Sequence, residues 1–217
     1  MGPRAMRMSI KMNFSRCAGS APLKAIGQQK RDLVSLMGLT KKQIRSKILL
    51  KLKTQKEADQ DRKSKIIKEK LFKLQIFQKA KRAMFYISFD GEVNTQEMIR
   101  EAQKLGKIIA VPVCTIGRTI RPCILRYNAR LAKGPYGIRE PATKRFMNLK
   151  DLDLVIVPGI AFDKKGNRLG RGKACYDYFL QKLPKDIPVV GLAFGFQILP
   201  FLPTTKTDIG VNRVIFA

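Results

Sequence analysis

The sequence predicts an α/β fold in which a largely parallel open sheet is flanked by helices. From Ala83 onward, short apolar runs alternate with helical patterns, which is typical of βαβ units. Residues 154–157, LVIV, are apolar throughout, as expected for a strand buried on both faces. The 217 residues, 45% of them apolar, suffice for one core with an extension. We therefore expect a single domain over residues 40–217, preceded by a basic N-terminal extension, residues 1–39.

Residues 40–56 are expected to form the first helix. Thr40 can serve as its N-cap. Apolar residues recur there at four-residue spacing, at Ile44, Ile48 and Leu52. Lys41 and Arg45 are also four apart and share another face of the helix, where two solvated charges are the usual explanation.

Residues 59–77 are expected to form a second helix, with a buried stripe at Ile67, Leu71 and Leu74. Its other side carries five lysines, Lys63, Lys65, Lys68, Lys70 and Lys73. This lysine face is open to two interpretations, a solvated surface or a surface that binds a polyanion.

The sheet is expected to form from the segments that follow. Strands are predicted at residues 84–89, 107–113, 120–127, 154–157, 189–194 and 213–216. A helix is predicted over residues 94–105, where Gly106 ends it, and another begins near Tyr176.

Basic residues far outnumber acidic ones, since 44 Lys and Arg against 16 Asp and Glu give a net charge of +28. Residues 1–39 contribute +6, residues 40–82 contribute +12 and the remainder contributes +10, so a cleavable leader does not account for the excess. Such a field attracts nucleic acid, an anionic membrane surface or a polyglutamylated substrate. No apolar run is long enough to span a bilayer.

The first 39 residues are rich in Arg, Ser, Met and Gly and contain one acid, Asp32. This composition favours an organellar transit segment, with a mitochondrion preferred over a chloroplast. A disordered basic tail and a retained arm that lies on RNA are the alternatives.

The chain has no histidine, and its four cysteines, Cys17, Cys114, Cys123 and Cys175, show no C-x-x-C spacing. These features argue against a zinc site and a histidine-based catalytic relay. We expect the thiols to be reduced and mostly buried.

Residues 154–177, LVIVPGIAFDKKGNRLGRGKACYD, join a strand to a helix through a glycine-rich basic loop. Glycines let backbone N–H groups approach an oxyanion, and a helix N-terminus adds a positive dipole. The expected ligand is a phosphate, although a solvated basic turn would have a similar sequence. Asn167 and Ala174 stand where a Walker A loop needs Gly and Ser or Thr, so that loop is excluded.

Residues 158–177 resemble the signature PG-x-x-FD-x-x-G-x-RLG-x-G-x-GYYD of the 5-formyltetrahydrofolate cyclo-ligase family. The resemblance covers residues 40–217 and implies the fold of that family, which is similar to NagB, RpiA and CoA transferases. It also implies conversion of 5-formyltetrahydrofolate to 5,10-methenyltetrahydrofolate with ATP. In that reaction the formyl oxygen takes the γ-phosphoryl group, and a ring-linked nitrogen then attacks the activated carbon and expels phosphate.

The resemblance implies an ATP site and a magnesium site. Its ATP-binding residues here are Lys41, Arg45, Arg168, Leu169, Gly170, Arg171, Gly172, Lys173 and Tyr176. Lys173 and Arg171 are expected to act on the transferred phosphoryl group. Asp177 and Asp208 match family positions associated with magnesium, a cation that suits carboxylate and phosphate oxygens.

The resemblance also implies a folate pocket with Glu92, Tyr136 and Cys175 in contact with the substrate. By local pattern alone, Glu92 reads as a helix-cap acid and Tyr136 as a packed turn aromatic. Ala174 and Cys175 replace a glycine and an aromatic residue of the family signature. We expect these changes to leave nucleotide binding intact and to impair folate binding.

The alternative function is that of a catalytically weakened cyclo-ligase fold that serves as a basic RNA-binding subunit. Its partners would be ribosomal RNA and ribosomal proteins of a mitochondrial ribosome or assembly particle. The lysine face of residues 63–73 would then contact the phosphate backbone.

Overall fold

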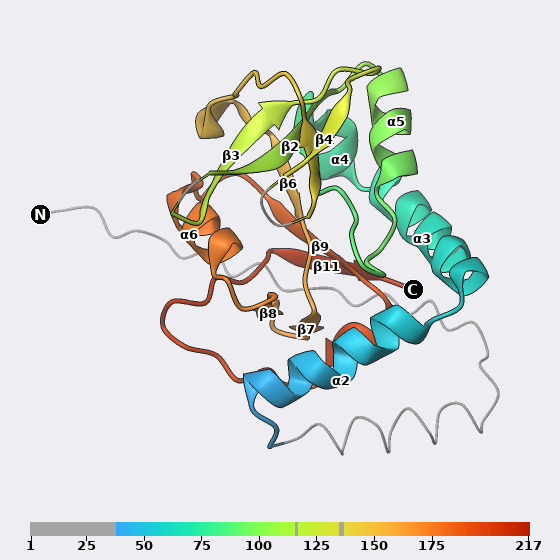
Figure 1. The fold of residues 1–217 in the computed structure, drawn as a ribbon, viewed down its shortest axis with the longest axis vertical. Helices are drawn as coiled ribbons and strands as arrows, with labels where there is room; N and C mark the ends of the chain where they lie inside the picture. The colour runs from blue at the N-terminus through green and yellow to red at the C-terminus, as the bar shows by residue number, and fades with distance from the viewer. Residues whose placement is uncertain (1–37, 116, 135–136) are drawn as a thin grey trace, which may run out of the picture.

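The computed structural model describes residues 38–115, 117–134 and 137–217. A six-stranded sheet runs through its centre (Figure 1). From one edge to the other the strands are β11 (Arg213–Phe216), β9 (Val189–Ala193), β6 (Leu154–Val157), β1 (Arg82–Met84), β2 (Ile108–Thr115) and β3 (Thr119–Ile124). All neighbours pair in parallel except β3, which is antiparallel to β2. The predicted largely parallel sheet is confirmed.

Helices cover both faces of this sheet. One face carries α2 (Lys41–Thr54), α3 (Glu57–Phe72), α4 (Gln75–Lys79) and α5 (Gln96–Lys104), and the other carries α6 (Cys175–Lys182). Figure 1 shows α6 across the sheet from α3 and α5. Successive side chains of a strand point to opposite faces, so Leu154 and Ile156 pack with the first group of helices while Val155 and Val157 pack with α6. The uninterrupted apolar run of β6 follows from this double burial.

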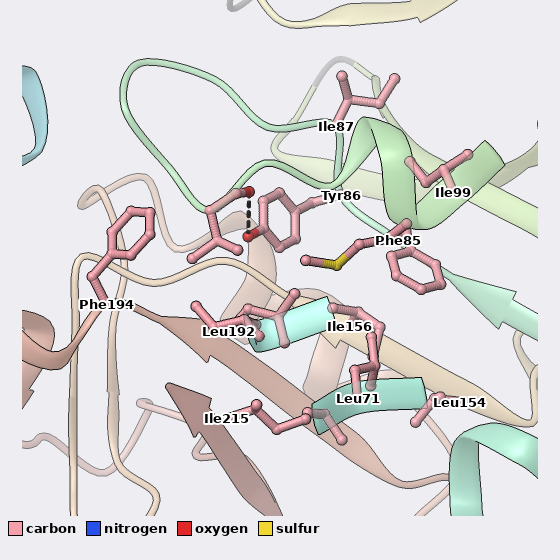
Figure 2. Packing of buried hydrophobic residues seen from close by; sticks show 14 of the residues in the cluster. Leu71, Phe85, Tyr86, Ile87, Ile99, Leu154, Ile156, Leu192, Phe194 and Ile215 are labelled. Atoms are coloured by element: carbon pink, nitrogen blue, oxygen red, sulfur yellow. Dashed lines mark hydrogen bonds between the residues drawn. The ribbon is translucent and has the colours of Figure 1, made fainter. Parts of the chain in front are cut away.

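The larger apolar cluster lies between the sheet and helices α2 to α5. Figure 2 shows Leu71 of α3 beside Leu154 and Ile156 of β6, with Leu192 of β9 and Ile215 of β11 on the same side of the sheet. Tyr86 is buried in the same cluster, and its hydroxyl donates a hydrogen bond of 3.1 Å to the carbonyl of Val93. The core therefore extends to the segment that follows β1, which fixes that segment in place.

The connecting segments contain short elements that the sequence did not predict. They are a small sheet of β10 (Ile198–Leu199), β7 (Ala161–Asp163) and β8 (Arg168–Leu169), a hairpin of β4 (Leu131–Lys133) and β5 (Arg139–Pro141), and the 3-10 turns η1 (Leu149–Asp151) and η2 (Gly195–Gln197). The basic loop, defined here as residues 168–174, therefore begins in a paired strand. In the part of the chain that the structure describes, no helix is long and apolar enough to cross a membrane.

Two predicted elements differ from the structure. The second helix ends at Phe72 and restarts at Gln75, because Leu74 is extended (ψ 131°) and becomes the N-cap of α4. The first strand ends at Met84, although residues up to Phe89 were expected in it. Its continuation leaves the ladder because the carbonyl of Tyr86 accepts a hydrogen bond of 2.6 Å from the Thr95 hydroxyl instead of a strand partner.

Candidate functional site

A cavity of about 300 Å³ lies at the carboxyl ends of β1 and β6, where the chain leaves two neighbouring parallel strands. In open α/β sheets this edge is the usual position of a ligand site. The segments after β1 and β6, parts of β2 and β3, and the basic loop form the walls. Glu92, Cys114 and Glu140 line it together with Arg168, Lys173 and Tyr176.

The turn between β7 and β8 positions the basic loop. Asp163 is buried, and its carboxylate accepts hydrogen bonds from the N–H groups of Lys165 (2.9 Å), Asn167 (3.0 Å) and Leu202 (3.2 Å). Gly166 has φ +84°, and a Cβ there would lie 2.4 Å from the carbonyl oxygen of Val211. The FD-x-x-G pattern thus builds a tight turn that only glycine can complete.

Helix α2 brings two predicted phosphate ligands to the basic loop. Arg45 Nε donates to the carbonyl of Gly170 at 2.8 Å. A Cβ added to Gly172 would lie 3.5 Å from Arg45 Cζ, so the guanidinium faces this glycine as well. Lys41 forms an ion pair with Asp208. The structure therefore gathers residues from opposite ends of the chain around one loop.

Arg168 is buried against α6. Its Nη2 donates to Asp177 Oδ1 at 2.8 Å, and its guanidinium lies 5.5 Å from the centre of the Tyr176 ring. The Arg168 side chain is 2% exposed, and its Nε has no hydrogen-bond partner among the described residues. A buried donor without a partner is costly, and a bound anion at the cavity would relieve that cost.

The two predicted magnesium ligands lie close together in the fold. Asp177 Oδ1 also accepts from the N–H of Ile209, at 3.2 Å, and Ile209 directly follows Asp208. Burial raises the pKa of Asp208, but hydrogen bonds from Lys41 and Thr205 outweigh it and hold the pKa below its ordinary value. The described residues contain no cluster of three or more His, Cys, Asp or Glu side chains able to hold a metal.

Glu92 is buried in the opposite wall of the cavity. Its Oε2 accepts from the N–H of Phe89 and its Oε1 from Nε of Arg171, both at 3.2 Å. Burial raises the pKa of Glu92 to about 7, while the Arg171 charge and the Phe89 N–H act against the rise. The acid is therefore poised to change its protonation state near neutral pH.

The remaining predicted site residues differ in where they lie. Lys173 and Cys175 line the cavity, Leu169 is buried in β8, and Tyr136 lies outside the described residues. Ala174 has φ +55°, a left-handed conformation that glycine would adopt more readily. Cys114, Cys123 and Cys175 are free thiols, Cys123 buried and the other two half-buried, while Cys17 lies outside the described part.

None of the five lysines proposed for RNA, Lys63, Lys65, Lys68, Lys70 and Lys73, lines the cavity. Lys68 is largely buried and pairs with Glu97 at 2.9 Å and Glu101 at 2.8 Å on α5. Lys70 donates to the carbonyl of Phe216 at 2.8 Å. Two members of the lysine face thus attach α3 to its neighbours, while Lys65 and Lys73 are exposed.

The sequence assigned no role to two acidic residues, Glu140 of the cavity wall and the half-buried Asp90. Glu140 is buried and accepts from the N–H of Cys114 at 2.9 Å, and its place in the segment Gly137–Pro141 was the only signal. Asp90 accepts from Arg171 at 3.0 Å, and its only signal was its position just after the first strand. Neither pattern specifies a partner so distant in the sequence.

Comparisons with known proteins agree with the fold. A profile of the 5-formyltetrahydrofolate cyclo-ligase family matches residues 38–217. A probable 5-formyltetrahydrofolate cyclo-ligase of Caenorhabditis elegans is 32% identical over 177 residues, which cover 76% of this chain and 85% of the relative. The mouse cyclo-ligase is 29% identical over 188 residues, 81% of this chain and 93% of the relative.

A solved structure is also similar. The 5,10-methenyltetrahydrofolate synthetase of Aquifex aeolicus superimposes with a TM-score of 0.73 at 32% identity, covering 82% of this chain and 90% of that protein. None of these comparisons supports the ribosomal alternative. The chain belongs to the 5-formyltetrahydrofolate cyclo-ligase family.

Proposed function

We propose that this protein converts 5-formyltetrahydrofolate to 5,10-methenyltetrahydrofolate with hydrolysis of ATP. One observation carries the proposal: a single cavity holds a buried acid, Glu92, on one wall and the basic loop on the other. The acid suits the polar edge of a pterin ring, and the loop suits phosphates. The relatives that bear the cyclo-ligase name support assigning this reaction to the site.

The nucleotide would bind along the basic loop and the first turns of α2. Lys41, Arg45 and Lys173 would meet phosphate oxygens, and Arg168 would donate its buried Nε. Backbone N–H groups near Gly170 and Gly172 would add neutral donors. The reaction needs no covalent nucleophile on the protein, so these residues would act by orienting the phosphates and neutralising charge.

Asp177 and Asp208 would hold magnesium, which would supply positive charge to the phosphates. Two oxygen donors from the protein are typical for this cation, which keeps water and phosphate as its other ligands. Each carboxylate already holds a cation, Arg168 for Asp177 and Lys41 for Asp208. Lys41, beside Asp208, would neutralise phosphate charge next to the cation.

The test is turnover by the full chain with magnesium, ATP and 5-formyltetrahydrofolate, followed by the absorbance of the methenyl product. Glu92→Gln is expected to lower kcat/KM by roughly a hundredfold, because it removes a buried, titratable carboxyl group from the reacting site. Lys42→Gln changes an exposed residue beside Lys41 and is the matched control. Folded protein that binds ATP but yields no product would refute the proposal and indicate that Ala174 and Cys175 obstruct the folate.

A further inference from the structure

Asp90 occupies a constrained backbone position between Phe89 and Glu92, which both line the cavity. Its φ is +53°, a left-handed conformation that Asp and Asn adopt more readily than most residues. The next residue, Gly91, has φ +79°, and a Cβ there would lie 2.3 Å from the carbonyl oxygen of Leu52 in α2. The turn is therefore held against α2, and ion pairs with Arg171 and Lys53 orient the Asp90 carboxylate.

Arg171 belongs to the basic loop but makes its side-chain contacts on the opposite wall. Nη1 donates to Asp90 Oδ2 at 3.0 Å, Nε to Glu92 Oε1 at 3.2 Å and Nη2 to the carbonyl of Phe89 at 3.3 Å. The guanidinium also lies 5.3 Å from the centre of the Phe89 ring. The planar group is thus engaged along both edges and one face by residues 89–92.

We propose that Asp90 is a positioning residue that fixes Arg171 against Glu92, so that Arg171 serves the substrate wall of the cavity and not the phosphates. Arg171 then connects the basic loop to the cavity wall that carries Glu92. This inference rests on the proposed function for the meaning of the Glu92 wall, but the geometry of Asp90 and Arg171 stands without it.

The proposal predicts in which direction the pKa of Glu92 changes when the charges around it are removed. The titratable groups that face Glu92 are Arg171, Asp90 and the two buried phenols Tyr86 and Tyr176. Burial has the largest effect and raises the pKa of Glu92. The charge of Arg171 lowers this pKa, and the charge of Asp90 raises it. Removing the Asp90 charge alone would therefore lower the pKa of Glu92, whereas releasing Arg171 would raise it.

The experiment is an NMR titration of the full chain labelled with ¹³C at the glutamate carboxyl carbon, with Glu92 assigned by Glu92→Gln. Wild-type Glu92 is expected to titrate at about 7. In Asp90→Asn, which keeps the left-handed preference, the pKa is expected to rise by about 0.5 to 1. An unchanged or lower pKa would overturn the positioning role.

Two further variants complete the cycle. In an Arg171→Met background, Asp90→Asn is expected to lower the Glu92 pKa, because only the charge effect remains. A rise in that background too would contradict the proposal. Lys53 lies 4.0 Å from the other oxygen of Asp90 and is 60% exposed, so Lys53→Gln is the control that leaves Arg171 in place. A rise in the Lys53→Gln variant would also count against the proposal.

Kinetics give an independent readout. Asp90→Asn is expected to raise KM for 5-formyltetrahydrofolate roughly threefold to tenfold while KM for ATP stays unchanged, as expected for loss of one partly exposed ion pair on the substrate wall. A rise in KM for ATP alone would place Arg171 with the nucleotide and overturn the inference. If the wild-type chain forms no product, the proposed function fails, while the titration still tests Asp90.

Discussion

Glu92 makes the stability of the fold depend on pH. Its pKa is raised from 4.5 to about 7 on folding, so the folded state holds a proton that the unfolded chain releases. Stability from this group is therefore fully present below pH 4.5 and is lost as the pH rises through about 7.

We expect wild-type protein to lose about 3 kcal/mol of unfolding free energy relative to Glu92→Gln between pH 4.5 and pH 8, since each pKa unit corresponds to about 1.4 kcal/mol. Urea denaturation of both proteins across this range measures the difference. A difference that is independent of pH would show that Glu92 has an ordinary pKa in the folded protein.

Ala174 carries backbone strain where the cyclo-ligase signature has glycine. Its φ of +55° costs an L-residue about 1 to 2 kcal/mol relative to glycine. Ala174→Gly is therefore expected to stabilise the protein by about 1 kcal/mol and to raise the melting temperature. Ala132→Gly in β4, an exposed alanine outside the left-handed region, is the control and is expected to destabilise. Equal effects in both variants would contradict this explanation.

Helix α2 carries two of the basic residues proposed to bind the nucleotide. Lys41 and Arg45 face Asp208 and Gly170, whereas Lys42 and Lys47 of the same helix are exposed. Lys41→Met and Arg45→Met are each expected to weaken magnesium-ATP binding by about tenfold or more, because each removes a charge-assisted bond to phosphate. Isothermal titration calorimetry measures this, with Lys42→Met and Lys47→Met as controls. Equal losses in all four would indicate only long-range attraction.

The elements with a strong apolar period were predictable from sequence, and those held by distant polar contacts were not. Ile44, Ile48 and Leu52 define α2, and the four apolar residues of β6 define a strand with two buried faces. By contrast, the early end of β1 depends on the Thr95 hydroxyl, and the β7–β8 turn on the buried Asp163. Local patterns do not encode such partners.

The candidate site, too, could be predicted only in part from the sequence. Gly170 and Gly172 with their neighbouring cations marked the basic loop in the sequence, and the structure places that loop on the cavity. The contact of Arg171 with the cavity wall that carries Glu92 could not be predicted, because Asp90 is 81 residues away from Arg171 in the chain. Glu140 was missed for the same reason, since its partner Cys114 lies 26 residues earlier.

At the scale of the whole molecule, the basic charge continues through residues 1–39, which include +6 of the total of +28. We propose that this segment directs the protein to mitochondria. Residues 1–39 fused to a fluorescent protein are expected to accumulate in mitochondria, and residues 40–217 fused to the same reporter are expected to lack that distribution. Cytosolic fluorescence from the first fusion would refute the proposal.

The last residues of the chain complete the packing of its first helices. Lys41 at the start of α2 pairs with Asp208, Lys70 of α3 binds the carbonyl of Phe216, and the N–H of Gly195 donates to Ala217 at 2.7 Å. A nascent chain that stops before residue 208 lacks these contacts and also lacks strand β11, which packs against α3. We expect such a stalled chain to leave part of the apolar face of α3 exposed and to depend on chaperones.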